Sequence, residues 1–185
     1  ANHRVVYPAR FQLVAAMNPC RCGHARDPGY ACRRQPNERC EAQYQARLSG
    51  PLLDRFDLQI MTPAVSAADL VLPPPAEGSR EVATRVARAR ARQRVRYDAL
   101  GLPGIIANAA APAGVIEDVA QLDAAGAALI REASDKYALT ARGFHRVLKL
   151  ARTIADLDGA DAVSRAHLAE ALSYRTGLAA GRLAA

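Results

Sequence analysis

Four cysteines stand close together near the start of the sequence, in the pattern Cys20-x-Cys22-x9-Cys32-x7-Cys40. Cysteine thiolates, with the imidazole of His24 between them, are ligands that suit tetrahedral zinc. The first pair is Cys-x-Cys rather than the Cys-x-x-Cys of common zinc ribbons, so free thiols stay open as the alternative. The first residues do not have the pattern of a secretion signal, which makes disulfides the weaker interpretation.

A run of arginines carries the densest charge in the sequence. It consists of Arg85, Arg88, Arg90, Arg92, Arg94 and Arg96. On a helix, four of them (at positions 85, 88, 92 and 96) share one face. The whole chain has a net charge of +7, so this face could contact the phosphates of DNA. A solvated face, or ion pairs with an adjacent subunit, are the alternatives.

The parts that bind a nucleoside triphosphate are missing from this sequence. It contains no G-x-x-x-x-G-K-[S/T] phosphate loop, and no apolar strand ends in paired acidic residues. These are the Walker A and Walker B elements that hold the phosphates and Mg²⁺. We therefore expect no ATP hydrolysis from this chain alone, and its residues leave open whether it is part of an enzyme.

The first third of the chain is predicted to contain strands. Short apolar runs at 4–7 and 11–16 and the alternating run 57–61 are typical of strands. The second run has the composition of a buried central strand, and it stops at Asn18-Pro19. Helices are predicted at 41–47 and, after Pro51, at 52–56. Three strands are too few to close a sheet, which predicts a fragment of a larger α/β domain.

The rest of the chain is predicted to be an all-α bundle, so that the whole is mostly α. A Pro- and Gly-rich linker precedes helices at 80–99, 115–119, 123–137, 140–157 and 164–172. Thr140 and Ser164 are expected to cap the last two helices at their N-termini. Gly159 is expected to end the helix before it, and residues 177–185 to fray.

Three sequence motifs resemble, in order, the second half of the ComM/YifB proteins, a family in the magnesium-chelatase branch of the AAA+ ATPases. They are Ala15-Ala16-Met17-Asn18-Pro19-Cys20, Ser49-Gly50-Pro51-Leu52-Leu53-Asp54-Arg55 and Ala151-Arg152-Thr153-Ile154-Ala155-Asp156-Leu157. The resemblance covers nearly the whole chain and is specific. It implies that the strands are the C-terminal strands of an AAA+ phosphate-loop core and that the helices are the lid.

The resemblance also implies roles for single residues. Asn18 falls at the sensor 1 position, where a carboxamide can bind the γ-phosphate and the attacking water. Arg55 falls at the arginine-finger position, which reaches the ATP of a neighbouring subunit. Arg142 falls at sensor 2, in the first turn of a lid helix, and Arg146 is the alternative for that position. Without the resemblance, these would be a turn asparagine, a cation paired with Asp54 or Asp57, and solvated arginines.

The implied domains are residues 1–62, the C-terminal part of the core, with sensor 1, the Cys-rich insertion and the arginine finger; 63–79, a linker; 80–176, the helical lid; and 177–185, the tail. The implied parent is a cytoplasmic homo-hexameric DNA motor, a helicase or branch-migration factor in natural transformation and recombination, which uses ATP and Mg²⁺. A magnesium-chelatase motor subunit and a non-enzymatic zinc-containing nucleic-acid-binding module are the alternatives. No apolar run is long enough to span a membrane, so no membrane partner is expected.

Overall fold

The chain divides into two compact units, residues 1–48 and 49–185. The computed structural model describes residues 4–7, 11–24, 27, 37–73 and 76–176. The division places the motif that begins at Ser49 in the same unit as the helices of the second half.

The described part of the first unit contains one helix and a turn that carries cysteines. Helix α1 spans Asn37–Gln45, so it begins and ends earlier than the predicted 41–47. The turn closes where the Gly23 amide donates to the Cys20 carbonyl at 3.1 Å. Gly23 has φ +87°, a left-handed conformation that glycine adopts without a Cβ clash. The turn brings Cys22 back beside Cys20.

The predicted strands at 4–7, 11–16 and 57–61 do not form within the described residues, where these segments have no regular secondary structure. Their large side chains are exposed, for example Val6 (85%) and Val14 (86%). A strand is stabilised by hydrogen bonds to a neighbouring strand, and no described segment pairs with these. The α/β prediction is therefore not met here, whereas the mostly helical prediction is confirmed.

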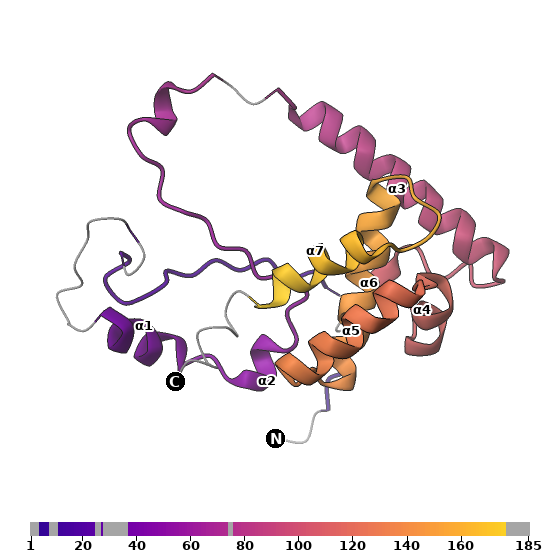
Figure 1. Cartoon of the computed structure of the whole chain (residues 1–185), viewed down its shortest axis with the longest axis horizontal. Helices are drawn as coiled ribbons and strands as arrows, with labels where there is room; N and C mark the ends of the chain where they lie inside the picture. The colour runs from indigo at the N-terminus through magenta and orange to yellow at the C-terminus, as the bar shows by residue number, and fades with distance from the viewer. Residues whose placement is uncertain (1–3, 8–10, 25–26, 28–36, 74–75, 177–185) are drawn as a thin grey trace. The chain divides into compact units, whose positions relative to one another are not determined.

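The elements of the second unit include a helical bundle built around α6, and two short elements precede that bundle in the chain (Figure 1). In chain order they are α2 (Gly50–Leu53), η1 (Asp69–Val71), α3 (Ser79–Ala99), η2 (Asn108–Ala110), α4 (Ala113–Ala120), α5 (Ala124–Tyr137), α6 (Ala141–Leu157) and α7 (Arg165–Thr176). Each predicted helix of the second half is present, with ends shifted by a few residues.

Side-chain caps and left-handed residues set the ends of these helices. The Thr140 hydroxyl accepts from the Gly143 amide at 2.9 Å, and the Ser164 hydroxyl accepts from the His167 amide at 3.4 Å. Gly159 follows α6 with φ +74°. The predicted caps and stop are thus confirmed. Residues 177–185, the expected frayed tail, lie outside the described residues.

Helix α6 supplies the centre of the core. It packs against α3, η2, α4 and α7, and α7 also packs against α5. The most buried apolar residues of α6 recur at helical spacing and are Val147, Leu148, Ala151, Ile154 and Ala155. Burying each large apolar side chain contributes about 1.5–3 kcal/mol. Among the described residues, no helix has both the length and the apolar composition needed to cross a membrane.

Candidate functional site

The segment that carries Arg55 begins with a capped turn of helix. The Ser49 hydroxyl accepts from the Leu52 amide at 3.3 Å, and Pro51 occupies the first turn, where its missing N–H costs nothing. Arg55 follows this turn and is exposed. Its guanidinium donates to the Pro51 carbonyl at 2.7 Å. The short helix therefore presents a cation at its C-terminal end.

The two aspartates beside Arg55 are paired with other arginines. Asp54 accepts from Arg175 of α7 at 3.1 Å, and Asp57 accepts from Arg146 of α6. Among the described residues, no carboxylate pairs with Arg55. The salt bridge with Asp54 or Asp57 that could explain Arg55 as a structural residue is thus absent here.

Helix α6 begins beside the same segment. Its capping residue, Thr140, donates its hydroxyl to Asp54 at 3.2 Å. Arg142, in the first turn, is exposed, and no described residue is recorded as its hydrogen-bond or ion-pair partner. Arg146, the alternative for the same role, is already paired with Asp57. A helix N-terminus and nearby guanidinium groups together favour an anion.

Asn18 belongs to the other unit, where it is exposed at the end of the unpaired segment that precedes Cys20. Arg55 and Arg142 belong to the second unit. The predicted contact of Asn18 with a γ-phosphate stays a prediction.

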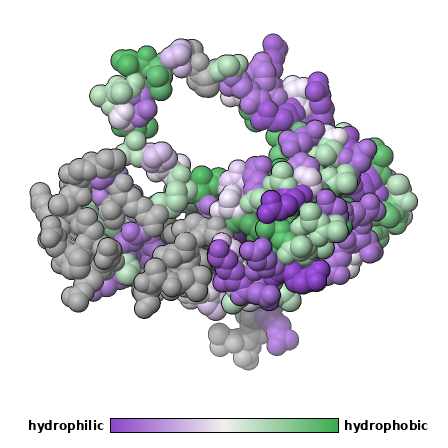
Figure 2. Space-filling view, viewed as in Figure 1, coloured by the Kyte–Doolittle hydropathy of each residue, from purple (hydrophilic) through white to green (hydrophobic). Residues whose placement is uncertain are grey.

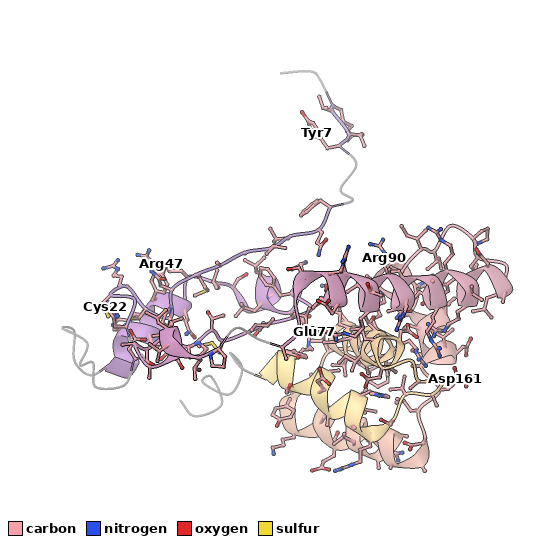
Figure 3. All side chains as sticks on the ribbon, turned by 90° about the horizontal axis from the view of Figure 1, so that it is seen from above. Tyr7, Cys22, Arg47, Glu77, Arg90 and Asp161 are labelled. Carbon is pink, nitrogen blue, oxygen red and sulfur yellow. The ribbon has the colours of Figure 1, made fainter. Side chains whose placement is uncertain are left out.

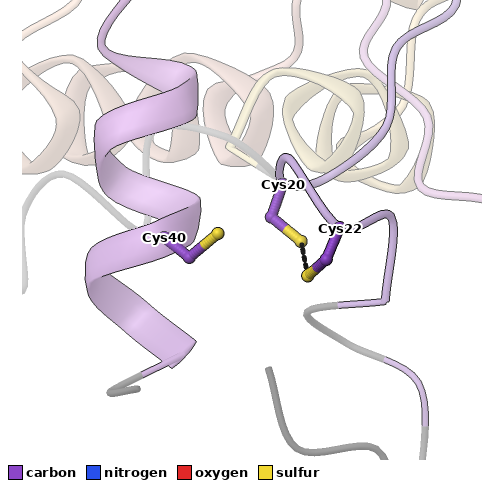
Figure 4. Close-up of side chains that lie close together, drawn as sticks. All are labelled: Cys20, Cys22 and Cys40. Atoms are coloured by element: carbon purple, nitrogen blue, oxygen red, sulfur yellow. Dashed lines mark hydrogen bonds between the residues drawn. The ribbon is translucent and has the colours of Figure 1, made fainter. Parts of the chain in front are cut away.

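Three of the four predicted zinc ligands converge (Figure 4). The Sγ atoms of Cys20, Cys22 and Cys40 all lie within 4.8 Å of one another, and Cys20 and Cys40 are buried. Tetrahedral zinc with Zn–S bonds of about 2.3 Å needs sulfurs roughly 3.8 Å apart, whereas the Sγ atoms of Cys20 and Cys22 lie 3.0 Å apart in a thiol hydrogen bond. The three thiols are donors that suit zinc, and binding the ion would require Cys20 and Cys22 to move slightly apart. The fourth predicted ligand, Cys32, lies outside the described residues, and His24 is instead hydrogen-bonded to Asp27 at 2.6 Å.

A small pocket lies beside these cysteines. It has a volume of about 220 Å³ and is lined by Arg21, Cys40, Gln43, Tyr44 and Arg47. Arg21 and Arg47 are exposed, so the pocket combines two cations with an aromatic ring. This lining suits an anionic group.

The basic run on α3 is divided between internal pairs and solvent. Arg85 pairs with Glu77, Arg92 with Asp161 at 2.6 Å, and Arg96 with Asp156. These are three of the four arginines of the predicted face, so that face is largely neutralised within the unit. The exposed arginines outside these pairs are Arg88, Arg90 and Arg94. Arg90 projects from α3 away from the bundle (Figure 3), and the hydrophilic surface of α3 is visible in Figure 2.

A buried polar network joins α3, η2 and α6, and sequence reasoning missed it. Fully buried Arg152 donates from Nε to Asp156 at 3.2 Å and from its two terminal nitrogens to the carbonyls of Asp161 and Ala160, each at 2.6 Å. Asn108 donates to Asp156 at 2.9 Å. The signal was present in the sequence, because positions 152 and 156 are four residues apart on an otherwise apolar helix face.

The network determines which protonation state of Asp156 is favoured. Burial alone raises the pKa of the Asp156 carboxyl, but hydrogen bonds from Arg96 and Asn108 and the charge of Arg152 outweigh burial, so the pKa lies below its ordinary value. The hydrogen bond that Arg96 donates to Asp156 raises the pKa of the Arg96 guanidinium, although burial alone would lower it. The carboxylate is therefore held ionised as a structural part of the bundle.

Comparison with known proteins places these features in a family. Residues 76–175 match the model of the C-terminal domain of magnesium chelatase subunit ChlI, and residues 1–70 match the model of magnesium chelatase subunit ChlI. The chain is 40% identical over 176 residues to the competence protein ComM of Haemophilus influenzae, covering 95% of this chain and 32% of that protein. It is 39% identical over 181 residues to the YifB protein of Escherichia coli, covering 93% and 32% respectively. The chain thus spans about a third of the length of these curated relatives.

Proposed function

Because this chain belongs to the magnesium chelatase ChlI family and is similar to ComM and YifB over nearly all its length, we propose that it is the sensor and lid portion of an AAA+ ATP-driven ring motor. The chain would supply Arg55 to the nucleotide of a neighbouring subunit, and Arg142 either to that nucleotide or to the one bound by its own subunit. A longer parent protein would supply the phosphate loop and the Mg²⁺ ligands. Self-association into a ring, expected to be hexameric, follows from this assignment.

The observation that carries this proposal is the exposed, uncompensated cation at Arg55. Its two neighbouring aspartates are paired with Arg146 and Arg175, so they do not neutralise it. A guanidinium can stabilise charge on the phosphoryl group during transfer, because its planar fork matches the phosphate oxygens. Arg142 at the start of α6 would add a second cation, and Asn18 would orient the attacking water as sensor 1.

We propose DNA as the substrate of the parent motor, with branch migration or helicase action in natural transformation as its role in the cytoplasm. The net charge of +7 supports contact with phosphates. So do the exposed arginines of α3 and the pocket between Arg21 and Arg47. A motor subunit that serves magnesium insertion is the alternative that the family description favours. Unwinding and strand-exchange assays on the parent protein separate these two.

We propose a structural zinc ion as the second cofactor, besides ATP with Mg²⁺. Cys20, Cys22 and Cys40 would hold it in the first unit, with Cys32 as the expected fourth ligand. Zinc would fasten the turn after Asn18 to helix α1, because all described ligands lie on these two elements. A non-enzymatic zinc module that binds nucleic acid would keep this site without any need for an exposed Arg55.

The test of the proposal is Arg55→Ala in the parent protein. We expect the hydrolysis rate to fall roughly 10³-fold or more while ATP binding stays nearly intact, because a finger stabilises the transition state more than the ground state. Arg131→Ala, at an exposed position of α5, is the matched control and should hydrolyse ATP normally.

Mixed rings test whether Arg55 acts across the interface. Subunits with a disabled phosphate loop still carry Arg55, so mixing them with Arg55→Ala subunits should restore part of the activity. Normal hydrolysis by Arg55→Ala rings would refute the assignment. So would the absence of recovery in mixed rings whose co-assembly has been verified.

A further inference from the structure

The segment that carries Arg55 is fastened to the helical bundle by Arg175, near the end of α7. One terminal nitrogen of Arg175 donates to the Phe56 carbonyl at 3.1 Å, and the other donates to the Asp54 carboxylate at 3.1 Å and to the Asp54 carbonyl at 3.4 Å. The Arg175 side chain is only 9% exposed. A guanidinium buried in this way joins the backbone on both sides of Arg55 to α7.

A further contact with α7 and two contacts with α6 hold the same segment. The backbone amide of Gln59 donates to the backbone carbonyl of Tyr174 at 2.8 Å. Asp57 is paired with Arg146 of α6, and Thr140 at the start of α6 donates to Asp54. Two helices that lie about a hundred residues further along the chain therefore fix the position of a segment with little regular structure of its own.

The same contacts also decide the charge around Arg55. Asp54 and Asp57 stand one and two residues from it, close enough to capture its guanidinium if they were free. Each is instead paired with an arginine of the bundle. Since a captured guanidinium would have to break an ion pair before it reached a phosphate, this pairing leaves Arg55 available.

We propose that Arg175 and Arg146 are positioning residues that lock the Arg55 segment onto the helical domain and neutralise the two aspartates beside Arg55. The lid helices and the arginine finger of one subunit then move as a single body. This inference rests on the proposed function for its catalytic consequence, but its structural part is independent of any activity.

The first test measures the lock directly in this chain by amide hydrogen exchange. We expect Arg175→Gln to raise the exchange rates of the hydrogen-bonded backbone amides in residues 56–59, those of Phe56 and Gln59, by roughly tenfold or more, because opening of this segment then breaks fewer hydrogen bonds. The amides of α6 should keep their protection, which shows that the bundle is still folded. Arg131→Gln is the control and should leave both regions unchanged. Unchanged exchange at 56–59 in Arg175→Gln would overturn the lock.

The second test uses hydrolysis by the parent ring and concerns charge. Arg146→Gln should lower kcat by roughly 10²-fold with KM nearly unchanged, since a misplaced or captured finger weakens the transition state. Adding Asp57→Asn to that variant should recover most of kcat, because the freed carboxylate is removed. If Asp57→Asn brings no recovery, Arg146 acts in another way, for example on the nucleotide, and the neutralising role is overturned.

Hydrogen exchange and the Arg55→Ala measurement distinguish a failure of the lock from a failure of the proposed function. If exchange at residues 56–59 responds as expected but Arg55→Ala rings hydrolyse ATP normally, the lock is real and the proposed function is wrong. If Arg55→Ala abolishes hydrolysis but exchange at residues 56–59 does not respond, the finger stands and the lock is wrong.

Discussion

Asp156 of α6 joins that helix to α3 through a buried polar network. It is buried and accepts hydrogen bonds from Arg96, Arg152 and Asn108. Removing one partner of a buried ion pair leaves the other charges without compensation, which costs more than the pair contributes. The otherwise apolar core therefore tolerates these buried charges only while all partners of the network are present.

We predict that Asp156→Asn lowers the free energy of unfolding by about 3–5 kcal/mol, because two arginines then lose their only shared carboxylate in the network. Chemical denaturation followed by circular dichroism measures this change. Asp161→Asn is the matched control: it removes a carboxylate that pairs with Arg92 but is fully exposed, so it should change stability little. Equal losses in the two variants would contradict the structural role of Asp156.

Asp156 should also contribute to the way the free energy of unfolding depends on pH. Folding lowers the pKa of Asp156 below its ordinary value of 3.8. Its contribution is therefore complete above that value and is lost as the pH falls from it towards the lower folded pKa. The stability difference between wild type and Asp156→Asn should stay constant from about pH 7 to 5 and narrow below about pH 4. Narrowing already between pH 7 and 5 would mean that burial dominates and that the pKa is raised.

The cysteine cluster makes a prediction about metal content. Protein purified without chelators should contain about one zinc per chain by elemental analysis. Cys20→Ser and Cys40→Ser should each lower that content, whereas His24→Gln should not, because His24 is hydrogen-bonded to Asp27. Less than about a tenth of an equivalent, with all four thiols freely reactive, would favour the free-thiol interpretation.

At the scale of elements, the helices were predictable because each has local signals. The apolar spacing along 140–157 and the caps at Thr140 and Ser164 are read from neighbouring residues, and both agree with the structure. The predicted strands are not shown by the described residues, because a strand forms only beside a partner strand, and the apolar pattern of one segment does not indicate its partner. The apolar runs at 4–7 and 11–16 are present, but the described residues contain no ladder for them.

The candidate site was predictable only in part for a similar reason. Motifs single out Arg55 and Arg142, but pairing between residues as distant in sequence as Asp54 and Arg175 has no local signal. The face of α3 that could contact DNA supplies Arg92 and Arg96 to carboxylates of its own unit. Charge periodicity identifies a helix face, but it does not tell whether solvent, nucleic acid or the protein itself neutralises that face.

At the scale of the whole molecule, the chain should be inactive by itself. We predict no ATP hydrolysis by the purified chain, because it has no phosphate loop to hold the β- and γ-phosphates. Measuring phosphate release is sufficient. Turnover near 1 s⁻¹ or faster, on the order of ordinary enzymes, that disappears on mutation of Asn18 would contradict both this prediction and the assignment of the chain as a sensor and lid portion.

The last turn of α7 limits how far this chain can be shortened in protein engineering. A version that stops at Ser173 would keep the buried apolar residues of α6 and α7, including Leu168, Ala171 and Leu172. It would lose the Tyr174 carbonyl and the Arg175 guanidinium, which together hold residues 54–59. Most of the core would remain, apart from its contact with the Tyr174 ring, so we expect such a protein to fold with a loose segment around Arg55. Deletion series and fusion junctions should therefore be placed after residue 176, since routine checks of folding would not detect a cut made a few residues earlier.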